Sequence, residues 1–331
     1  MNHLLKQLTR SFQPISLDDL NTRASLLERQ ENKYILSVEQ LQEMLGFLSN
    51  KFDILTIGDQ TAHNYRSVYF DTKEMVGYRY DIQGSIKRRF KARTRYYVES
   101  GLCYFEVKLK DKRGGTVKKR LRYDAKDYGT ITPLAKRFLE DAYIALYGVP
   151  FEHQLTARLE GSYSRITLVA KAGGERMTID FNLSFTNGTN TTLTRPLIIV
   201  ETKSSNGNGI ADMAFRRRNI RPQGCSKFCL GVNLLGFKVR YNKFKPLLEM
   251  YHRLPDNDYS QTLVDVQSQM VLSFPSPAQN QPSSQYSYQL QAEEYSKFAY
   301  AGLFKQLQIR RTILETSEDI YLVRTPAAVM V

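Results

Sequence analysis

The stretch IKRRFKARTRYY at residues 86–97 decides how the rest of this sequence is interpreted. In a β-strand, successive side chains point to opposite faces of the sheet. Five cations then share one face and the other face is largely apolar: Lys87, Arg89, Lys91, Arg93 and Arg95 oppose Ile86, Phe90, Ala92 and Tyr96, with Arg88 and Thr94. The cations recur about every 6.6 Å along such a strand, which suits a linear polyanion. An exposed strand with a solvated basic face would show the same alternation.

The neighbouring segments repeat this cationic bias. In 104–110, Phe105, Val107 and Leu109 face one way, and Glu106, Lys108 and Lys110 face the other. Further along, Lys118, Arg120 and Arg122 share a face, and Arg176, Thr178, Asp180 and Asn182 oppose Met177, Ile179, Phe181 and Leu183. A half-exposed sheet also alternates, but a solvated face normally mixes its charge signs. A sheet closed with its charged faces inward would form a polar tunnel that needs an anionic guest, because packed like charges repel.

Period-two segments outnumber helices, which predicts an α+β, β-rich fold. The predicted strands are 31–36, 65–71, 78–82, 86–97, 103–110, 117–123, 163–170, 176–183 and 196–203. The predicted helical segments are 16–28, 38–49, 133–147 and 226–252. At least eight strands with few helices favour a closed antiparallel barrel or two packed sheets over a doubly wound sheet.

The 331 residues divide by composition into four predicted parts. A helical extension at 1–26 precedes a strand-rich domain at 27–252. A linker at 253–291 follows, because 273–291 is rich in Ser, Gln and Pro and almost uncharged. A tail at 292–331 has no predicted role and could hold a short helix and a strand at 320–323.

The charge balance points to an anionic partner. There are 47 Lys and Arg against 33 Asp and Glu, a net charge of +14, which attracts nucleic acid, phosphate chains or anionic membranes. Three cysteines without metal-ligand spacing predict a reducing compartment. The start of the chain lacks a signal-peptide pattern and no apolar run reaches membrane-spanning length. We therefore expect a cytoplasmic protein.

A few acids fall on strands among the basic residues: Glu31, Glu106, Asp180 and Glu201. Carboxylates with phosphate oxygens form the usual hard-oxygen site for Mg²⁺ or Mn²⁺. Each acid could instead pair with a neighbouring Lys or Arg, above all Glu31 and Glu106. Glu201 is the leading candidate ligand for a divalent metal, Mn or Mg.

Nine short motifs occur in one order. They are Arg29-x-x-x-Lys33-Tyr34, Val68-Tyr69-Phe70-Asp71-Thr72, Lys91-x-Arg93-x-Arg95-Tyr96, Phe105-Glu106-Val107-Lys108, Lys119-Arg120, Tyr163-x-Arg165, Arg176-x-Thr178-Ile179-Asp180, Val200-Glu201-x-Lys203 and Ser226-Lys227-Phe228. Together they resemble the VTC domain (vacuolar transporter chaperone), the polyphosphate polymerase branch of the triphosphate tunnel metalloenzymes, or CYTH-like superfamily. The resemblance covers about residues 27–240 and implies an eight-stranded antiparallel β-barrel tunnel with flanking helices.

The resemblance also implies roles for individual residues. Beside Arg89 and Lys91 of the first segment, the expected phosphate-binding residues are Lys33, Arg93, Arg95, Lys108, Arg120, Arg165, Arg176 and Lys203. Lys227 would approach the transferred phosphate, with Arg93 and Arg95 stabilising it, and Glu201 would hold the metal. Hydrolytic members carry Glu-x-Glu-x-Lys on the first strand, where this chain has Arg29, Glu31 and Lys33. The basic first position favours transfer between phosphate chains over hydrolysis.

These observations favour a metal-dependent polyphosphate polymerase that uses ATP and polyphosphate. The alternatives are a triphosphatase and a non-catalytic polyphosphate or inositol phosphate-binding module. A nucleic-acid-binding protein would need aromatic residues among the cations, whereas Phe90 and Tyr96 lie on the opposite face of their strand. Eukaryotic relatives couple synthesis to membrane translocation. Because no membrane-spanning segment is predicted in this sequence, such coupling would require a membrane-associated partner. The oligomeric state stays open.

Overall fold

The computed structural model describes residues 9–24, 28–83, 88–111, 114–193, 197–254 and 321–324. The strands are β1 (Gln13–Ile15), β2 (Glu28–Leu36), β3 (Phe52–Leu55), β4 (Ala62–Asp71), β5 (Phe90–Tyr97), β6 (Leu102–Lys110), β7 (Gly115–Tyr123), β8 (Thr156–Ala170), β9 (Arg176–Thr186), β10 (Thr191–Leu193), β11 (Ile198–Ser204) and β12 (Tyr321–Arg324). The helices are α2 (Leu17–Arg23), α3 (Val38–Leu48), α4 (Val76–Gln83), α5 (Pro133–Tyr147), α6 (Ile210–Arg217), α7 (Lys227–Leu234) and α8 (Lys245–Arg253), with short 3-10 turns η1 (Ala125–Asp127) and η2 (Asn242–Phe244).

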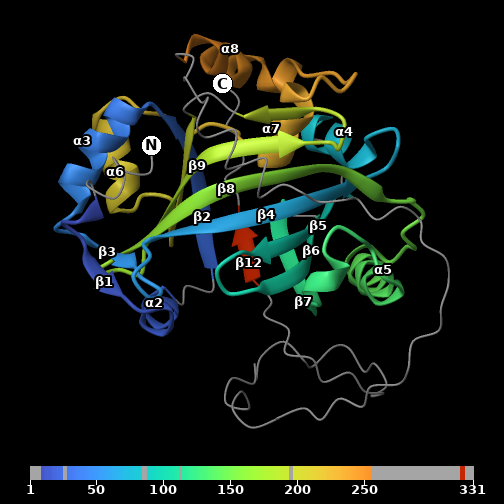
Figure 1. The fold of residues 1–331 in the computed structure, drawn as a ribbon, viewed down its shortest axis with the longest axis horizontal. Helices are drawn as coiled ribbons and strands as arrows, with labels where there is room; N and C mark the ends of the chain where they lie inside the picture. The colour runs from blue at the N-terminus through green and yellow to red at the C-terminus, as the bar shows by residue number, and fades with distance from the viewer. Residues whose placement is uncertain are drawn as a thin grey trace, which may run out of the picture.

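Strand pairing closes the sheet into a barrel (Figure 1). The order β8-β4-β5-β6-β7-β12-β2-β11-β9 returns to β8 because β8 also pairs with β9. The eight longer strands pair antiparallel with one another, and the short β12 sits between β7 and β2, antiparallel to the first and parallel to the second. The predicted α+β, β-rich class and the antiparallel barrel with flanking helices are confirmed.

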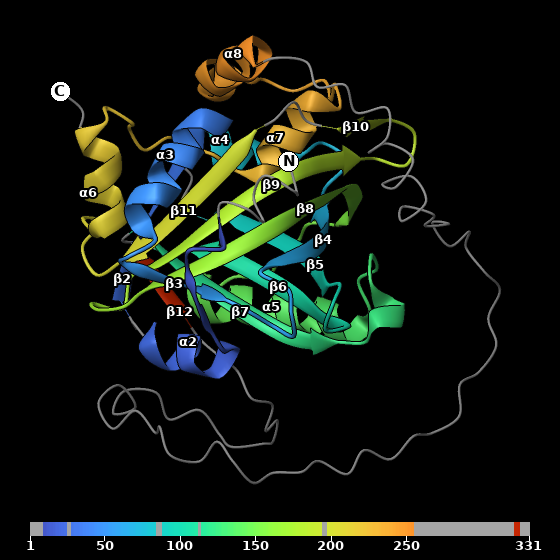
Figure 2. The same cartoon turned by 60° about the vertical axis from the view of Figure 1, so that its left-hand side comes forward.

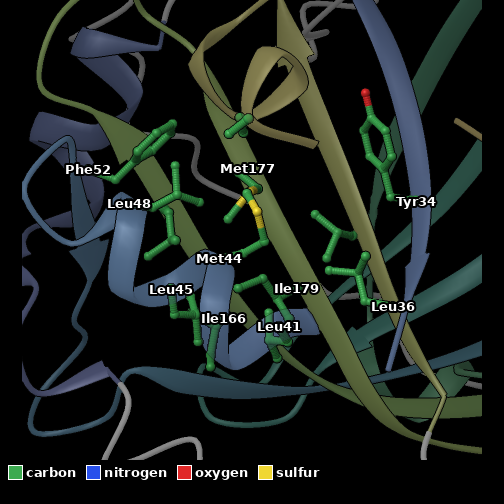
Figure 3. Packing of buried hydrophobic residues seen from close by; sticks show 14 of the residues in the cluster. Tyr34, Leu36, Leu41, Met44, Leu45, Leu48, Phe52, Ile166, Met177 and Ile179 are labelled. Carbon is green, nitrogen blue, oxygen red and sulfur yellow. The ribbon is translucent and has the colours of Figure 1, made fainter. Parts of the chain in front are cut away.

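Helix α3 covers one outer side of the barrel. A capping box fixes its start, since Ser37 accepts from the Gln40 backbone N–H and the Gln40 side chain accepts from the Ser37 N–H. Its buried residues pack on the outward side chains of β8 and β9, as Figure 3 shows for Met44, Ile166 and Met177. Helix α6 lies beside α3 in both views (Figures 1 and 2). The apolar faces of these strands therefore point outward, under helices.

Helix α5 covers the opposite outer side, over β6 and β7. Thr132 caps its first turn, Pro133 occupies the first position, and Gly148 ends it with a positive φ. Phe105 and Val107 of β6 join its buried residues in one apolar cluster. Because the apolar side of β6 is used outward, the charged side of the same strand faces the interior.

Helix α7 closes one end of the barrel. Phe228 and Leu230 pack with Tyr69 of β4 and Phe185 of β9 in a single cluster. A Cβ on Gly231 would lie 2.6 Å from the Phe185 ring, so glycine permits this close approach. The closing helical segment predicted at 226–252 is thus two helices, α7 and α8, joined through η2.

Two local predictions were wrong. Segment 78–82 is not a strand but part of α4, because the buried Asp71 carboxylate accepts hydrogen bonds from the backbone N–H groups of Gly77 and Tyr78, 2.8 Å each, and fixes a helical turn. Leu183 does not share the outward face of Phe181. Asn182 has a φ of 51°, and the pairing with β8 shifts register there, so the bulge turns Leu183 toward α7.

Several sequence predictions concern residues with little or no structural description. Residues 84–87, the predicted linker at 253–291 except its first two residues, and the helix within the tail lie outside the described residues. β12 overlaps the strand predicted at 320–323. The four-part domain division stays a prediction. Among the described helices, none combines the length and apolarity that a membrane span requires.

Candidate functional site

Many charged side chains of the barrel strands share its interior face. Residues directly opposite one another in an antiparallel pair project to the same side, and the register aligns them in rows. The rows are Arg93, Glu106 and Arg120; Lys91, Lys108 and Lys118; Arg165, Asp180 and Ile199; Lys33, Glu201 and Thr178; and Glu31, Lys203 and Arg176. We call these residues, together with Arg95 and Lys227, the interior set.

The first ion cluster of the interior set joins β5, β6 and β7. The buried Glu106 accepts from the Arg93 guanidinium at 2.5 and 2.7 Å and lies 2.6 Å from the Lys118 ammonium. Burial alone would raise the pKa of Glu106, but the charges of Arg93 and Lys118 hold it well below its ordinary value. Burial lowers the pKa of Lys118 to about 8. This carboxylate is a fixed anion between two cations.

The second cluster joins β8, β9 and the first residue of α7. Asp180 is fully buried and accepts from Arg165 through both carboxylate oxygens, at 2.6 and 2.8 Å. The Lys227 ammonium donates to the same carboxylate. Burial opposes ionisation of Asp180, yet Arg165 and Lys227 lower its pKa. Asp180 therefore holds the start of the closing helix against the barrel wall.

The third cluster joins β2 and β11. Glu201 accepts from Lys33 at 2.9 Å and from Lys203 at 2.7 Å, and Glu31 pairs with the same Lys33. Burial opposes ionisation of Glu201, but Lys203 and Lys33 hold its pKa well below the ordinary value. Two carboxylates from neighbouring strands therefore meet at one lysine.

Lys108 of β6 lies among cations of several strands. Burial holds its pKa well below the ordinary value, and the charges of Arg93, Lys118 and Lys33 lower it further. Lys33 belongs to β2 and the other two to β5 and β7, so cations from three strands act on one ammonium group. An anion entering the interior would relieve this repulsion.

A fifth acid, Asp81 of α4, was not predicted from the sequence, because 78–82 was interpreted as a strand. Its carboxylate accepts from Lys91 at 2.8 Å and lies 3.9 Å from Arg89. Lys91 also donates to the Ser226 hydroxyl at 3.1 Å. Burial opposes ionisation of Asp81, but Lys91 lowers its pKa to about 2. Arg89 itself precedes β5 rather than lying within it.

Tyrosines also line the interior. This corrects the argument against nucleic-acid binding that aromatic residues lie only on the face opposite the cations. Phe90 does lie in the outer cluster under α5, with Tyr96 packed against that cluster. However, Arg95 lies over the rings of Tyr65 and Tyr163, at 5.6 and 5.9 Å from their centroids. Aromatic side chains therefore do accompany the cations. They come from neighbouring strands, so the alternation along one strand could not predict them.

The three predicted metal ligands do not come together. Glu31 and Glu201 meet at Lys33, whereas Glu106 belongs to the cluster of Arg93 and Lys118. No group of three His, Cys, Asp or Glu side chains that could hold a metal occurs in the described part of the chain. Mg²⁺ is commonly held by one or two carboxylates plus substrate phosphates. The Glu31 and Glu201 pair fits that type of site.

The family described as the VTC domain matches residues 28–236 of the chain. Among curated proteins, no match is found. A solved structure of a Hippeastrum protein with a dominant triphosphatase activity is similar at 15% identity, with 63% of this chain and 97% of that one covered and a TM-score of 0.37. A Bacillus halodurans protein provisionally named an adenylate cyclase is similar at 14% identity, with 70% and 97% covered and a TM-score of 0.33.

Proposed function

Because the chain belongs to the VTC domain family, we propose that it is a polyphosphate polymerase that transfers the γ-phosphate of ATP to a growing polyphosphate chain inside the barrel. The observation that carries this proposal is the charge of the interior set. Its cations outnumber its carboxylates, and three of those carboxylates are each already held between two cations. A run of phosphates is the guest that such a wall would bind most strongly.

Transfer needs positioning and charge neutralisation rather than covalent chemistry by the protein. A terminal oxygen of the polyphosphate chain attacks the γ-phosphorus, forming a new P–O bond. The bond from that phosphorus to the bridging oxygen breaks, and ADP leaves with the electron pair. Arg165 and Lys227, which share Asp180, would turn toward the equatorial oxygens, and Arg93 and Arg95 would orient the neighbouring phosphates.

A divalent metal, Mn²⁺ or Mg²⁺, would be held by Glu201 and Glu31. Such an ion would supply positive charge that neutralises the phosphate groups of the substrate. The residues themselves impose a condition on this site. Lys33 pairs with both carboxylates and would have to leave at least one of them, for which a phosphate oxygen offers a replacement partner.

A triphosphatase is the second candidate, and the meeting of Glu31 and Glu201 favours it, since two carboxylates would give a metal a firmer site. A third possibility is a binding module without turnover. Incubation of the full chain with ATP and Mn²⁺ distinguishes them by product: polyphosphate with ADP for the polymerase, inorganic phosphate with ADP for the hydrolase, and unchanged ATP for the binding module. The cytoplasmic location and a membrane-associated partner stay predictions from the sequence.

A further inference from the structure

Four tyrosines form a continuous line along the interior wall, from β8 across β4 and β5 to β6. Tyr163 stacks on Tyr65 with ring centroids 5.3 Å apart and planes 2° from parallel. Tyr65 meets Tyr97 edge-on at 5.0 Å, and Tyr97 meets Tyr104 edge-on at 5.9 Å. The strand register places Tyr65 directly opposite both Tyr163 and Tyr97, so the line follows from the pairing of the strands.

Arginines lie over the rings at both ends of this line. The Arg165 guanidinium is 5.2 Å from the Tyr65 centroid and 5.3 Å from that of Tyr163. At the other end, Arg120 and Arg122 lie 5.0 and 5.5 Å from the Tyr104 centroid. Guanidinium planes and aromatic rings are the two groups on which nucleobases stack.

The line runs from the buried interior toward the end of the barrel opposite α7. Tyr163 is 4% exposed, contacts the Lys227 ammonium and has a buried hydroxyl without a hydrogen-bond partner among the described residues. Tyr97 and Tyr104 are only partly buried and lie where β5 ends and β6 begins. One end of the line therefore lies beside the residues assigned to the transferred phosphate, and the other lies at the barrel mouth.

Phosphate binding alone gives no reason for such a line, because a phosphate group has no π-face. We propose that Tyr97 and Tyr104, with Arg120 and Arg122, form a stacking site for the base of a nucleoside triphosphate whose phosphates extend inward along Tyr65 and Tyr163. The inference rests on the proposed function and deepens it, because it assigns the residues that recognise the base of the nucleotide donor through its π-face. Stacking of this kind tolerates different bases. Because purines have the larger π-face, we expect them to bind better than pyrimidines.

The test compares two ligands, ATP and inorganic triphosphate, by calorimetric titration of the full chain with Mg²⁺ present. Tyr97→Leu and Tyr104→Leu are expected to weaken ATP binding about tenfold and to leave triphosphate binding unchanged, while Tyr97→Phe retains both affinities. Tyr241→Leu is the matched control, because Tyr241 is 50% exposed and precedes η2 outside the interior set. The chain has no Trp, so quenching of the triphosphate of 2-aminopurine riboside reports stacking directly and should be lost in the two leucine variants.

Equal loss of ATP and triphosphate affinity in the leucine variants would show that the tyrosines only support the wall, and would overturn the stacking site. So would a wild-type chain that binds triphosphate as tightly as ATP and leaves the 2-aminopurine fluorescence unchanged. If the wild-type chain binds neither ligand, the proposed function falls as well. The triphosphate titration thus separates failure of the stacking site from failure of the phosphate site.

Discussion

Lys227, the first residue of α7, donates to the buried carboxylate of Asp180 on β9. The same carboxylate accepts from Arg165 on β8, so one acid fixes two barrel strands and the closing helix. Asp180 also holds two cations of the interior set, Arg165 and Lys227, next to each other. Replacing Asp180 should therefore change both the stability of the fold and the binding of phosphate.

Replacing Asp180 with Asn should destabilise the protein by about 3 kcal/mol, because Arg165 and Lys227 would stay buried without their counter-ion. Urea unfolding monitored by circular dichroism measures the loss. Short inorganic polyphosphate should raise the melting temperature of Asp180→Asn more than that of the wild type, since it replaces the missing anion. Equal rises in the two proteins would count against phosphate binding at Arg165 and Lys227.

Replacing Glu201 with Gln should weaken Mn²⁺ binding in the presence of triphosphate by tenfold or more, while triphosphate affinity without metal is kept or increased. The reason is that one carboxylate ligand is lost and Lys33 and Lys203 are left available to phosphate. Electron paramagnetic resonance of free Mn²⁺ measures the binding. Glu106→Gln is the matched control, because Glu106 is another interior carboxylate held between two cations, in a separate ion cluster. Similar losses in both variants would contradict a metal site at Glu201.

Stability should fall as the pH rises through the titration of Glu175. This buried carboxylate accepts from the backbone N–H groups of Ile210 and Ala211 at the start of α6, yet burial raises its pKa to about 7. The folded state thus favours the protonated form of Glu175. The stability that this preference contributes is complete below the pKa of the unfolded state, near 4.5, and is lost as the pH rises to about 7. The loss is roughly 3 kcal/mol. Glu175→Gln should flatten this part of the pH profile, and an identical profile would contradict the assignment.

The C-terminal strand should matter for the barrel wall. β12 is hydrogen-bonded to β7 on one side and β2 on the other, and successive backbone N–H groups of a strand point to opposite sides. Leu322→Pro and Val323→Pro therefore each remove a bond to a different neighbour. Amide hydrogen exchange should accelerate at residues 28–30 of β2 in one variant and at residues 115–118 of β7 in the other. Ala327→Pro, at a position after β12, is the control. Unchanged exchange in both variants would exclude β12 from the wall.

The sequence was most informative where a pattern spans one strand. Alternation along 86–97 and 103–110 placed Arg93, Lys108 and their neighbours on one face, and the strand register shows that these residues share one side of the sheet. The periodicity failed where a single side chain overrides it. Asp71 turns a predicted strand into α4, and the positive φ of Asn182 reverses the face of Leu183.

Relationships between strands lay beyond the sequence pattern. Nothing in the spacing of Glu31 and Glu201 shows that they meet at one lysine while Glu106 does not. The line of tyrosines has the same origin, since its members come from four strands and only the register aligns them. Asp81 was hidden because its helix was taken for a strand.

The central claim, transfer of phosphate from ATP to a polyphosphate chain, is tested most directly by ³¹P nuclear magnetic resonance. The full chain is incubated with ATP and Mn²⁺, and the metal is removed by chelation before the spectrum is recorded. We expect signals of mid-chain phosphates that grow as the γ-phosphate signal of ATP declines and ADP accumulates, and their loss in Lys227→Ala. Orthophosphate as the only new phosphorus species beside ADP would contradict the account and identify a triphosphatase.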